Sequence, residues 1–354
     1  MADRLVFLLV LRRALRRERV FRDRQNPFDV YDDVDLYCRF RFRRPDIVEL
    51  CNIIKDDIDH PLNRKGAMPP IMQLMVALRF YATGCFQQVV GDIFGIDKTT
   101  VSRIIEKVSR AFSVRLNEFV RLPTPLQEAD QTIAKFYQKA DFPNVVGCID
   151  CTHVQILAPT ENEHVYVNRK GRHSINVQLV CDADLIIINC VVNWPGSVHD
   201  SRILRESNIF QLFETLPRPI PGILLGDAGY PLKEWLMTPF TDPQTREKER
   251  FNGSHCSTRS TIERTNGVLK KRWHCLHSQL RYDPPRACRI IMACTVLHNV
   301  AMTLGLPDPD SDTDDSDNSD PEDGSDDEIE NGDRNGAVSG RLARERIVAR
   351  YFHK

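Results

Sequence analysis

The stretch 145-VVGCIDCTHVQI-156 is an apolar run of strand length with one carboxylate, Asp150, near its middle. A second stretch, 222-GILLGDAGYPL-232, places Asp227 directly after another short apolar run. Both runs are typical of buried strands. Carboxylates at the ends of adjacent strands, joined by one from a packing helix, can hold two divalent cations about 4 Å apart. The two stretches therefore predict an α/β fold whose sheet carries an acidic site.

The third carboxylate of this group is Glu263, in 259-RSTIERTNGVLKKRW-273. The segment predicts a basic helix, with Glu263 near its start. At helical spacing Asn266, Gly267 and Lys270 share its face. Glycine at 267 would permit a close backbone approach, and Lys270 would meet a phosphate. A single aspartate at a strand end is more simply a turn or cap residue, so the site prediction depends on three carboxylates in places that agree with one fold.

The order of the remaining patterns predicts the architecture. Apolar runs predict strands at 145–156, 175–184, 185–193 and 222–230 and a short one at 236–240, with a hairpin bend at Ala183–Asp184. One helix is expected in each of the segments 122–143, 201–216, 261–276 and 285–305. Strand, hairpin, helix, strand, helix is the order of an RNase H-like mixed sheet with flanking helices.

An all-α region precedes the sheet. Residues 71–84 predict a helix that ends at Gly84, and 86–112 predict a helix, a turn through Gly95 and Asp97, and a second helix. This arrangement is typical of a helix-turn-helix, whose second helix reads DNA near its start; an ordinary three-helix bundle is the alternative. The candidate DNA-contacting residues are Lys98, Thr99, Thr100, Ser102 and Arg103.

Charge is distributed unevenly along the 354 residues. The formal net charge is −1, but residues 308–333 contain fourteen acidic and no basic residues, so the rest of the chain has a balance of +13. A basic folded part fits a polyanion such as DNA, although a basic protein with a solubilising tail is the simpler alternative. The acidic segment has no aromatic residue and predicts disorder.

Eleven cysteines, an odd number, are scattered mostly in apolar runs and indicate a reducing compartment with no disulfide framework. Cys148 and Cys151 form a lone C-x-x-C that we assign to core packing rather than zinc. The apolar stretch within residues 5–11 is too short to cross a bilayer, so no membrane association is expected; with the following arginines it would form a basic amphipathic helix or a nuclear-import segment.

Several longer motifs resemble those of the PIF/Harbinger transposase family of the DDE superfamily, and most closely its transposase-derived nucleases. They are NRKGRHSINVQLVCD, NWPGSVHDSRIL, GDAGYPLKEWLMTPF, RSTIERTNGVLKKRW and TVLHNVA, which begin at residues 168, 193, 226, 259 and 295. The resemblance covers residues 65 to 304. The 35 residues between Asp227 and Glu263 equal the gap of "DD35E" transposases.

The resemblance implies a metal-dependent nuclease that cleaves DNA with Mg²⁺ or Mn²⁺, with Asp150, Asp227 and Glu263 as catalytic ligands. Asp200 joins them as an additional metal carboxylate. It stands where a helix N-cap is expected, but it also follows Asp150 at the gap of a second Harbinger aspartate. Taking it as second would make Glu234 the third carboxylate, outside the late helix, so we prefer Glu263.

Further expectations follow from the same resemblance. Basic residues that would neutralise DNA phosphates are Arg169, Lys170, Arg264, Lys270 and Lys271, for which a solvated basic face is the alternative. Relatives work with a separate Myb-like DNA-binding protein, which implies a similar partner and a nuclear location with a cytoplasmic pool. Homo-oligomerisation stays open. A catalytically silent DNA-binding or adaptor protein is the main alternative, and an RNA-processing enzyme fits less well.

The expected organisation is a variable segment at 1–64, a helix-turn-helix domain at 65–125 and an RNase H-like nuclease domain at 140–305. A disordered acidic tail at 306–336 and a short basic segment at 337–354 follow.

Overall fold

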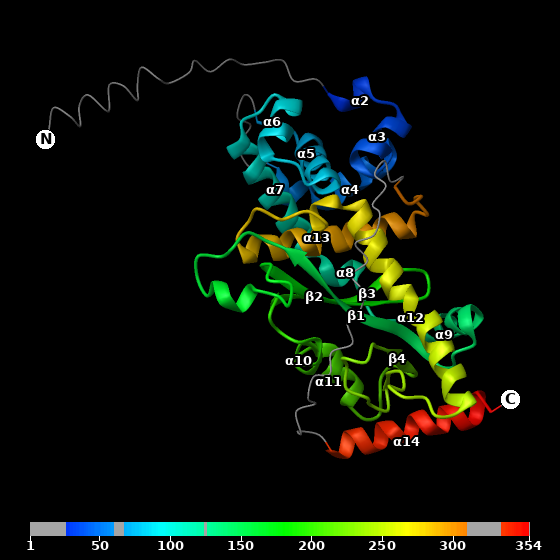
Figure 1. Cartoon of the computed structure of the whole chain (residues 1–354). Coiled ribbons are helices and arrows are strands. Elements are labelled where there is room, and N and C mark those ends of the chain that lie inside the picture. Colours follow the sequence, from blue (N-terminus) through cyan, green and yellow to red (C-terminus); the bar gives the residue numbers. More distant parts are fainter. Residues whose placement is uncertain (1–25, 60–66, 124–125, 310–333, 354) are drawn as a thin grey trace, which may run out of the picture.

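The computed structural model describes residues 26–59, 67–123, 126–309 and 334–353 (Figure 1). The apolar-basic start of the chain and residues 310–333 of the expected disordered tail 306–336 lie outside these ranges, so the expectations for them stay predictions. The two ends of that expected tail are described: Leu306 is buried, and the helix α14 (Arg334–Tyr351) begins at Arg334. No helix within the described ranges has both the length and the apolar character needed to cross a membrane.

A five-stranded mixed sheet forms the centre of the α/β part. Its strands are β1 (Val145–Gln155), β2 (Ser174–Cys181), β3 (Ile187–Pro195), β4 (Ile223–Leu225) and β5 (Leu236–Met237), in the order β3-β2-β1-β4-β5. The first three strands pair antiparallel, whereas β4 is parallel to β1 and β5 to β4. The five predicted strands are confirmed.

The predicted hairpin bend between β2 and β3 is stabilised by Asp182. Its carboxylate accepts hydrogen bonds from the backbone N–H groups of Asp184 and Ile186, at 2.8 and 2.9 Å. Aspartate commonly closes turns in this way. The bend therefore follows from local sequence chemistry.

Helices surround the sheet and form a separate layer on one side of it (Figure 1). The N-terminal helices are α2 (Pro27–Val30), α3 (Asp33–Phe40), α4 (Arg44–Ile58), α5 (Pro70–Thr83), α6 (Gln87–Phe94), α7 (Lys98–Ser113) and α8 (Leu116–Phe119). The others are α9 (Leu126–Ala140), α10 (Asp200–Arg205), α11 (Asn208–Glu214), α12 (Arg246–Arg272), α13 (Pro284–Thr303) and α14 (Arg334–Tyr351), with short 3₁₀ turns η1 (Glu163–Tyr166) and η2 (His274–Leu276).

Three expectations about helices are wrong. The helix expected at 201–216 is two helices, because Ser207 ends α10 and its hydroxyl accepts the Phe210 N–H to start α11, at 3.3 Å. The described part of the segment 1–64, for which the sequence predicted no helix, forms α2, α3 and α4, and the Asn26 and Asp32 side chains cap the first two. The basic helix begins at Arg246, capped by Thr245, so Glu263 lies well inside it.

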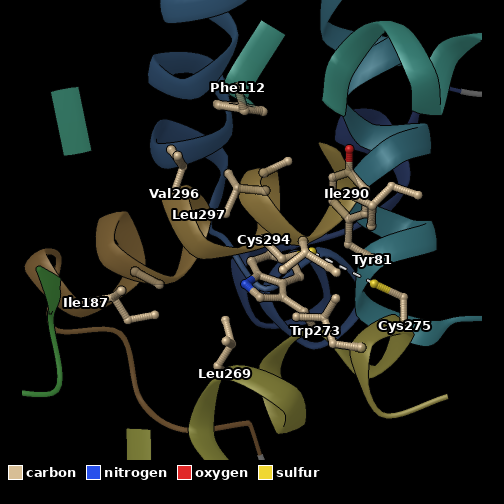
Figure 2. Close-up of a cluster of buried hydrophobic side chains, with 14 of the residues drawn as sticks. Tyr81, Phe112, Ile187, Leu269, Trp273, Cys275, Ile290, Cys294, Val296 and Leu297 are labelled. Atoms are coloured by element: carbon tan, nitrogen blue, oxygen red, sulfur yellow. Dashed lines mark hydrogen bonds between the residues drawn. The ribbon is translucent and has the colours of Figure 1, made fainter. Parts of the chain in front are cut away.

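Helix α13 joins the helical layer to the sheet, because it packs against both α7 and β3. Figure 2 shows its Ile290, Cys294 and Leu297 among side chains from α5, α7, α12 and β3. The thiols of Cys275 and Cys294 form a hydrogen bond at 3.9 Å (Figure 2) and no disulfide, and all eleven cysteines are free, as expected. The helical layer and one face of the sheet therefore share one apolar core.

Candidate functional site

Strands β1 and β4 bring Asp150 and Asp227 to neighbouring positions. Cys148 of β1 pairs with Leu225 of β4 in the parallel register. Asp150 stands two residues after Cys148, and Asp227 stands two residues after Leu225. The Asp227 carboxylate accepts the Gly229 N–H at 3.1 Å, which fixes the turn after β4. The prediction that these aspartates come from adjacent strands is confirmed.

The electrostatics of Asp150 reflect that placement. Burial of its carboxyl group raises the pKa of Asp150 to about 8, and the negative charges of Asp227 and Asp200 act in the same direction. The nearby Arg259 guanidinium opposes the rise. A desolvated carboxyl beside like charges resists ionisation. A cation bound beside Asp150 would therefore favour its ionised form.

Helix α12 reaches Asp150 through Asn266. The amide nitrogen of Asn266 donates to Asp150 Oδ2 at 3.0 Å. One turn earlier, Glu263 forms an ion pair with Arg259, and its side chain is 46% exposed. The sequence placed Asn266 on the face of Glu263 but gave it no role, and that spacing was the only signal for this contact.

Lys270 lies two turns beyond Glu263 and also faces β1. Its ammonium donates to the backbone carbonyl of His153 at 3.0 Å. Burial lowers the pKa of Lys270 to about 8, although the charge of Asp150 works against that shift. The positively charged ammonium group of Lys270 therefore lies near Asp150.

Asp200 is the first residue of α10, and His199 occupies the capping position. The Asp200 carboxylate accepts the Asn176 Nδ2–H at 2.9 Å, and the same nitrogen donates to the Val198 carbonyl at 2.9 Å. The N-cap interpretation of Asp200 is thus wrong, because its side chain bonds to β2 instead of its own helix. Its charge still contributes to the field at Asp150.

Glu234, the alternative third carboxylate, lies in the connection between β4 and β5. It forms an ion pair with Arg218 at 3.0 Å. Neither residue belongs to α12. This position agrees with the preference for Glu263 over Glu234.

A divalent cation is the group that the family resemblance implies here. Within the described residues, no group of three or more His, Cys, Asp or Glu side chains is arranged to hold a metal ion. The chemistry of the adjacent Asp150 and Asp227 nevertheless fits one, because carboxylate oxygens suit Mg²⁺ or Mn²⁺ and a cation would relieve their mutual repulsion. The Arg259 ion pair engages the third expected ligand, Glu263.

The residues expected to contact DNA fall on three separate elements. At the start of α7, Lys98, Thr99 and Arg103 are exposed, whereas Thr100 and Ser102 are half-buried. Asp97 caps this helix by accepting the Thr99 N–H at 2.8 Å. Arg169 and Lys170 are exposed in the loop before β2, and Arg264 and Lys271 are exposed on α12.

Comparison with known proteins adds an independent line of evidence. A family model described as "DDE superfamily endonuclease" matches residues 149–299, which include all four candidate carboxylates. The Homo sapiens protein "Putative nuclease HARBI1" is 37% identical over 80% of this chain and 82% of its own length. The Xenopus laevis protein of the same name is 36% identical over the same shares. "Protein ALP1-like" of Arabidopsis thaliana is 27% identical over 75% of this chain and 70% of its own. No solved structure matches the chain.

Proposed function

The chain belongs to the Harbinger transposase-derived nuclease family, with a DDE superfamily endonuclease domain, and on that premise we propose that it cleaves DNA phosphodiester bonds with divalent cations. The observation that carries the proposal is the parallel pairing of β1 with β4, which sets Asp150 beside Asp227. The strand order supports a finer assignment to the RNase H-like fold.

The proposed roles follow from position and charge. Asp150 and Asp227 would hold the cation through their carboxylate oxygens, and Asp200 would contribute from α10. Glu263 would join them once its ion pair with Arg259 is broken. Bound cations would activate the attacking water and stabilise the leaving oxygen. Lys270 lies beside β1, where its ammonium would balance charge and meet a phosphate of bound DNA.

We extend the proposal to how DNA is held. The exposed start of α7 would contact duplex DNA in the manner of a helix-turn-helix, and the basic residues of α12 and of the loop before β2 would neutralise phosphates. A separate Myb-like protein, self-association, and a nuclear location with a cytoplasmic pool belong to the same proposal. Salt sensitivity is the physical signature of such contacts.

The decisive experiment incubates the purified full-length chain with labelled duplex DNA and Mn²⁺. We expect cleavage by the wild type and its loss in Asp150→Asn, because that change removes the central ligand. Asp130→Asn, an exposed aspartate on α9, is the control and should cleave normally. Equal cleavage by wild type and Asp150→Asn would show that the activity does not come from this site.

One observation favours a second candidate, a catalytically silent DNA-binding or adaptor protein. The Glu263–Arg259 ion pair occupies the expected third ligand. This candidate predicts DNA binding without cleavage and without any Mn²⁺ response. Arg259→Gln, which frees Glu263, would then leave the protein inactive, whereas a live site would keep metal-dependent cleavage.

A further inference from the structure

Asn266 carries an oxygen that the protein itself does not use. The residue is only 9% exposed, and among the described residues its amide oxygen Oδ1 is buried without a hydrogen-bond partner. Buried polar atoms without partners are uncommon in folded proteins and need an explanation. A bound ion or a water molecule at this position would supply the missing partner.

The orientation of this amide follows from chemistry. In the structure Asn266 presents its nitrogen to Asp150 Oδ2 at 3.0 Å, and this is the orientation that an ionised, cation-bound carboxylate requires, because it only accepts hydrogen bonds. The oxygen on the same planar group is then directed away from that carboxylate oxygen. The amide therefore both orients Asp150 and leaves an oxygen donor beside it.

The neighbouring donors define what this oxygen would bind. Asp150 and Asp227 come from the paired strand segments β1 and β4 and supply carboxylate oxygens, which are ligands for hard divalent cations. Amide oxygens are ligands for the same hard cations that carboxylates bind. Asn266 follows Glu263 by three residues, so both lie on one face of α12. Glu263 is already paired with Arg259, whereas Asn266 donates a hydrogen bond directly to Asp150.

We propose that Asn266 is a cation-binding residue of this site, with its nitrogen holding Asp150 in place and its oxygen coordinating the divalent ion. The inference rests on the proposed function, because it assumes that the carboxylates bind such an ion. It goes beyond the carboxylate set by adding a neutral ligand from α12. A water molecule bridging Asn266 to unrelated groups is the competing account.

The test measures Mn²⁺ binding to the purified full-length protein by isothermal titration, without DNA and independent of activity. Asn266→Leu keeps the size of the side chain but removes its oxygen, and we expect the Mn²⁺ dissociation constant to rise about tenfold or more. Asn266→Asp keeps an oxygen in place and should bind Mn²⁺ at least as tightly as the wild type. Thermal melting of each metal-free variant checks that it folds.

Asn252 provides the matched control on the same helix. Its amide is fully used inside the protein, since Nδ2 donates to the Phe240 carbonyl and Oδ1 accepts the Phe240 N–H, both at 2.8 Å. Asn252→Ala should therefore lower the melting temperature but leave the Mn²⁺ dissociation constant unchanged. If Asn266 acted in folding alone, Asn266→Leu would likewise lower the melting temperature and leave the Mn²⁺ dissociation constant unchanged.

The outcomes separate this inference from the proposed function. If Asp150→Asn abolishes Mn²⁺ binding while Asn266→Leu binds like the wild type, the Asn266 inference is overturned and the metal site stands. If the wild type binds no Mn²⁺, or Asp150→Asn binds it normally, both ideas fall. Should Asn266→Leu not fold, weakened binding by a folded Asn266→Asp would overturn the inference.

Discussion

Asp150 is the residue at which burial, charge and function meet. Its carboxyl group lies beside Asp227, which stands just after β4, and accepts a hydrogen bond from Asn266 of α12, and its pKa is raised to about 8. The unfolded chain would ionise the same group near its ordinary value of 3.8. The metal-free folded state therefore keeps a proton that the unfolded state releases.

This difference predicts how stability depends on pH. A raised folded pKa gives a stabilising contribution that is complete below about pH 3.8 and is lost as pH rises through about 8. With a chelator present to keep the protein metal-free, the melting temperature of the wild type should fall relative to that of Asp150→Asn as the pH is raised from 5 to 8. Comparing the two proteins cancels the opposite contribution of His255 and His298, whose pKa values burial lowers to about 4. If the melting temperatures of the two proteins changed in parallel with pH, the raised pKa would not belong to Asp150.

At the scale of one element, α12 contains two glycines that lie at different distances from Asn266. Gly253 and Gly267 are both exposed, and an added Cβ would meet nothing within 4 Å at either position. Glycine inside a helix costs about 0.5–1 kcal/mol relative to alanine. Both Gly→Ala variants should therefore raise the free energy of unfolding by about that amount, measured by urea denaturation.

The same pair tests the role of α12 in substrate binding. Gly267 stands next to Asn266, so its missing side chain leaves room for a DNA backbone, whereas Gly253 lies more than three turns away. Gly267→Ala should weaken DNA binding at low salt and Gly253→Ala should not, as measured by fluorescence anisotropy. Equal affinities would mean that DNA does not approach this part of the helix.

Helix α13 holds the outer edge of the sheet through Asn299. Its amide accepts the Ile187 N–H at 2.9 Å and donates to the carbonyls of Ile187 and Phe119 at 2.7 and 2.8 Å. Asn299→Ala leaves these buried groups unpaired and should lower the free energy of unfolding by about 2–3 kcal/mol. Gln211→Ala, at an exposed position of α11, should change it by less than about 0.5 kcal/mol in the same denaturation series.

At the scale of the whole molecule, charge separates the acidic segment from the rest of the chain. Fourteen acidic residues lie between 308 and 333, and without them the formal charge changes from −1 to +13. These carboxylates would compete with DNA phosphates for the basic surface. Leu306 and Pro307 are outside the segment to be changed, because their carbonyls accept hydrogen bonds from Arg272.

Replacing residues 310–333 by a neutral Gly/Ser sequence of equal length should raise DNA affinity at low ionic strength. The gain should shrink as salt rises, since screening shortens the range of the repulsion to about 10 Å at 0.1 M. Fluorescence anisotropy at several salt concentrations measures both effects. An affinity that is unchanged at low salt would exclude competition by the acidic segment.

The sequence by itself determined the elements whose apolar pattern is strong. The five strands, the bend at Asp182–Ile186, the Gly84 end of α5 and the Asp97 cap of α7 all arise from short-range chemistry. The adjacency of Asp150 and Asp227 could also be predicted, because one lies in a predicted strand and the other directly after the apolar run of another, in a chain order that brings those strands together. Local pattern and chain order are sufficient for such features.

Only the tertiary structure decided the extent and the contacts of α12. Its first half buries polar residues such as His255 and Thr258, so no apolar periodicity marks the helix there, and the predicted start fell too late. The pairing of Glu263 with Arg259 and the contact of Asn266 with Asp150 depend on the rotation of the helix over β1 and on competition between side chains. Residue types and spacing place Glu263, Asn266 and Lys270 on one face of α12. The packing of the helix over β1 decides that Asn266 forms the hydrogen bond to Asp150.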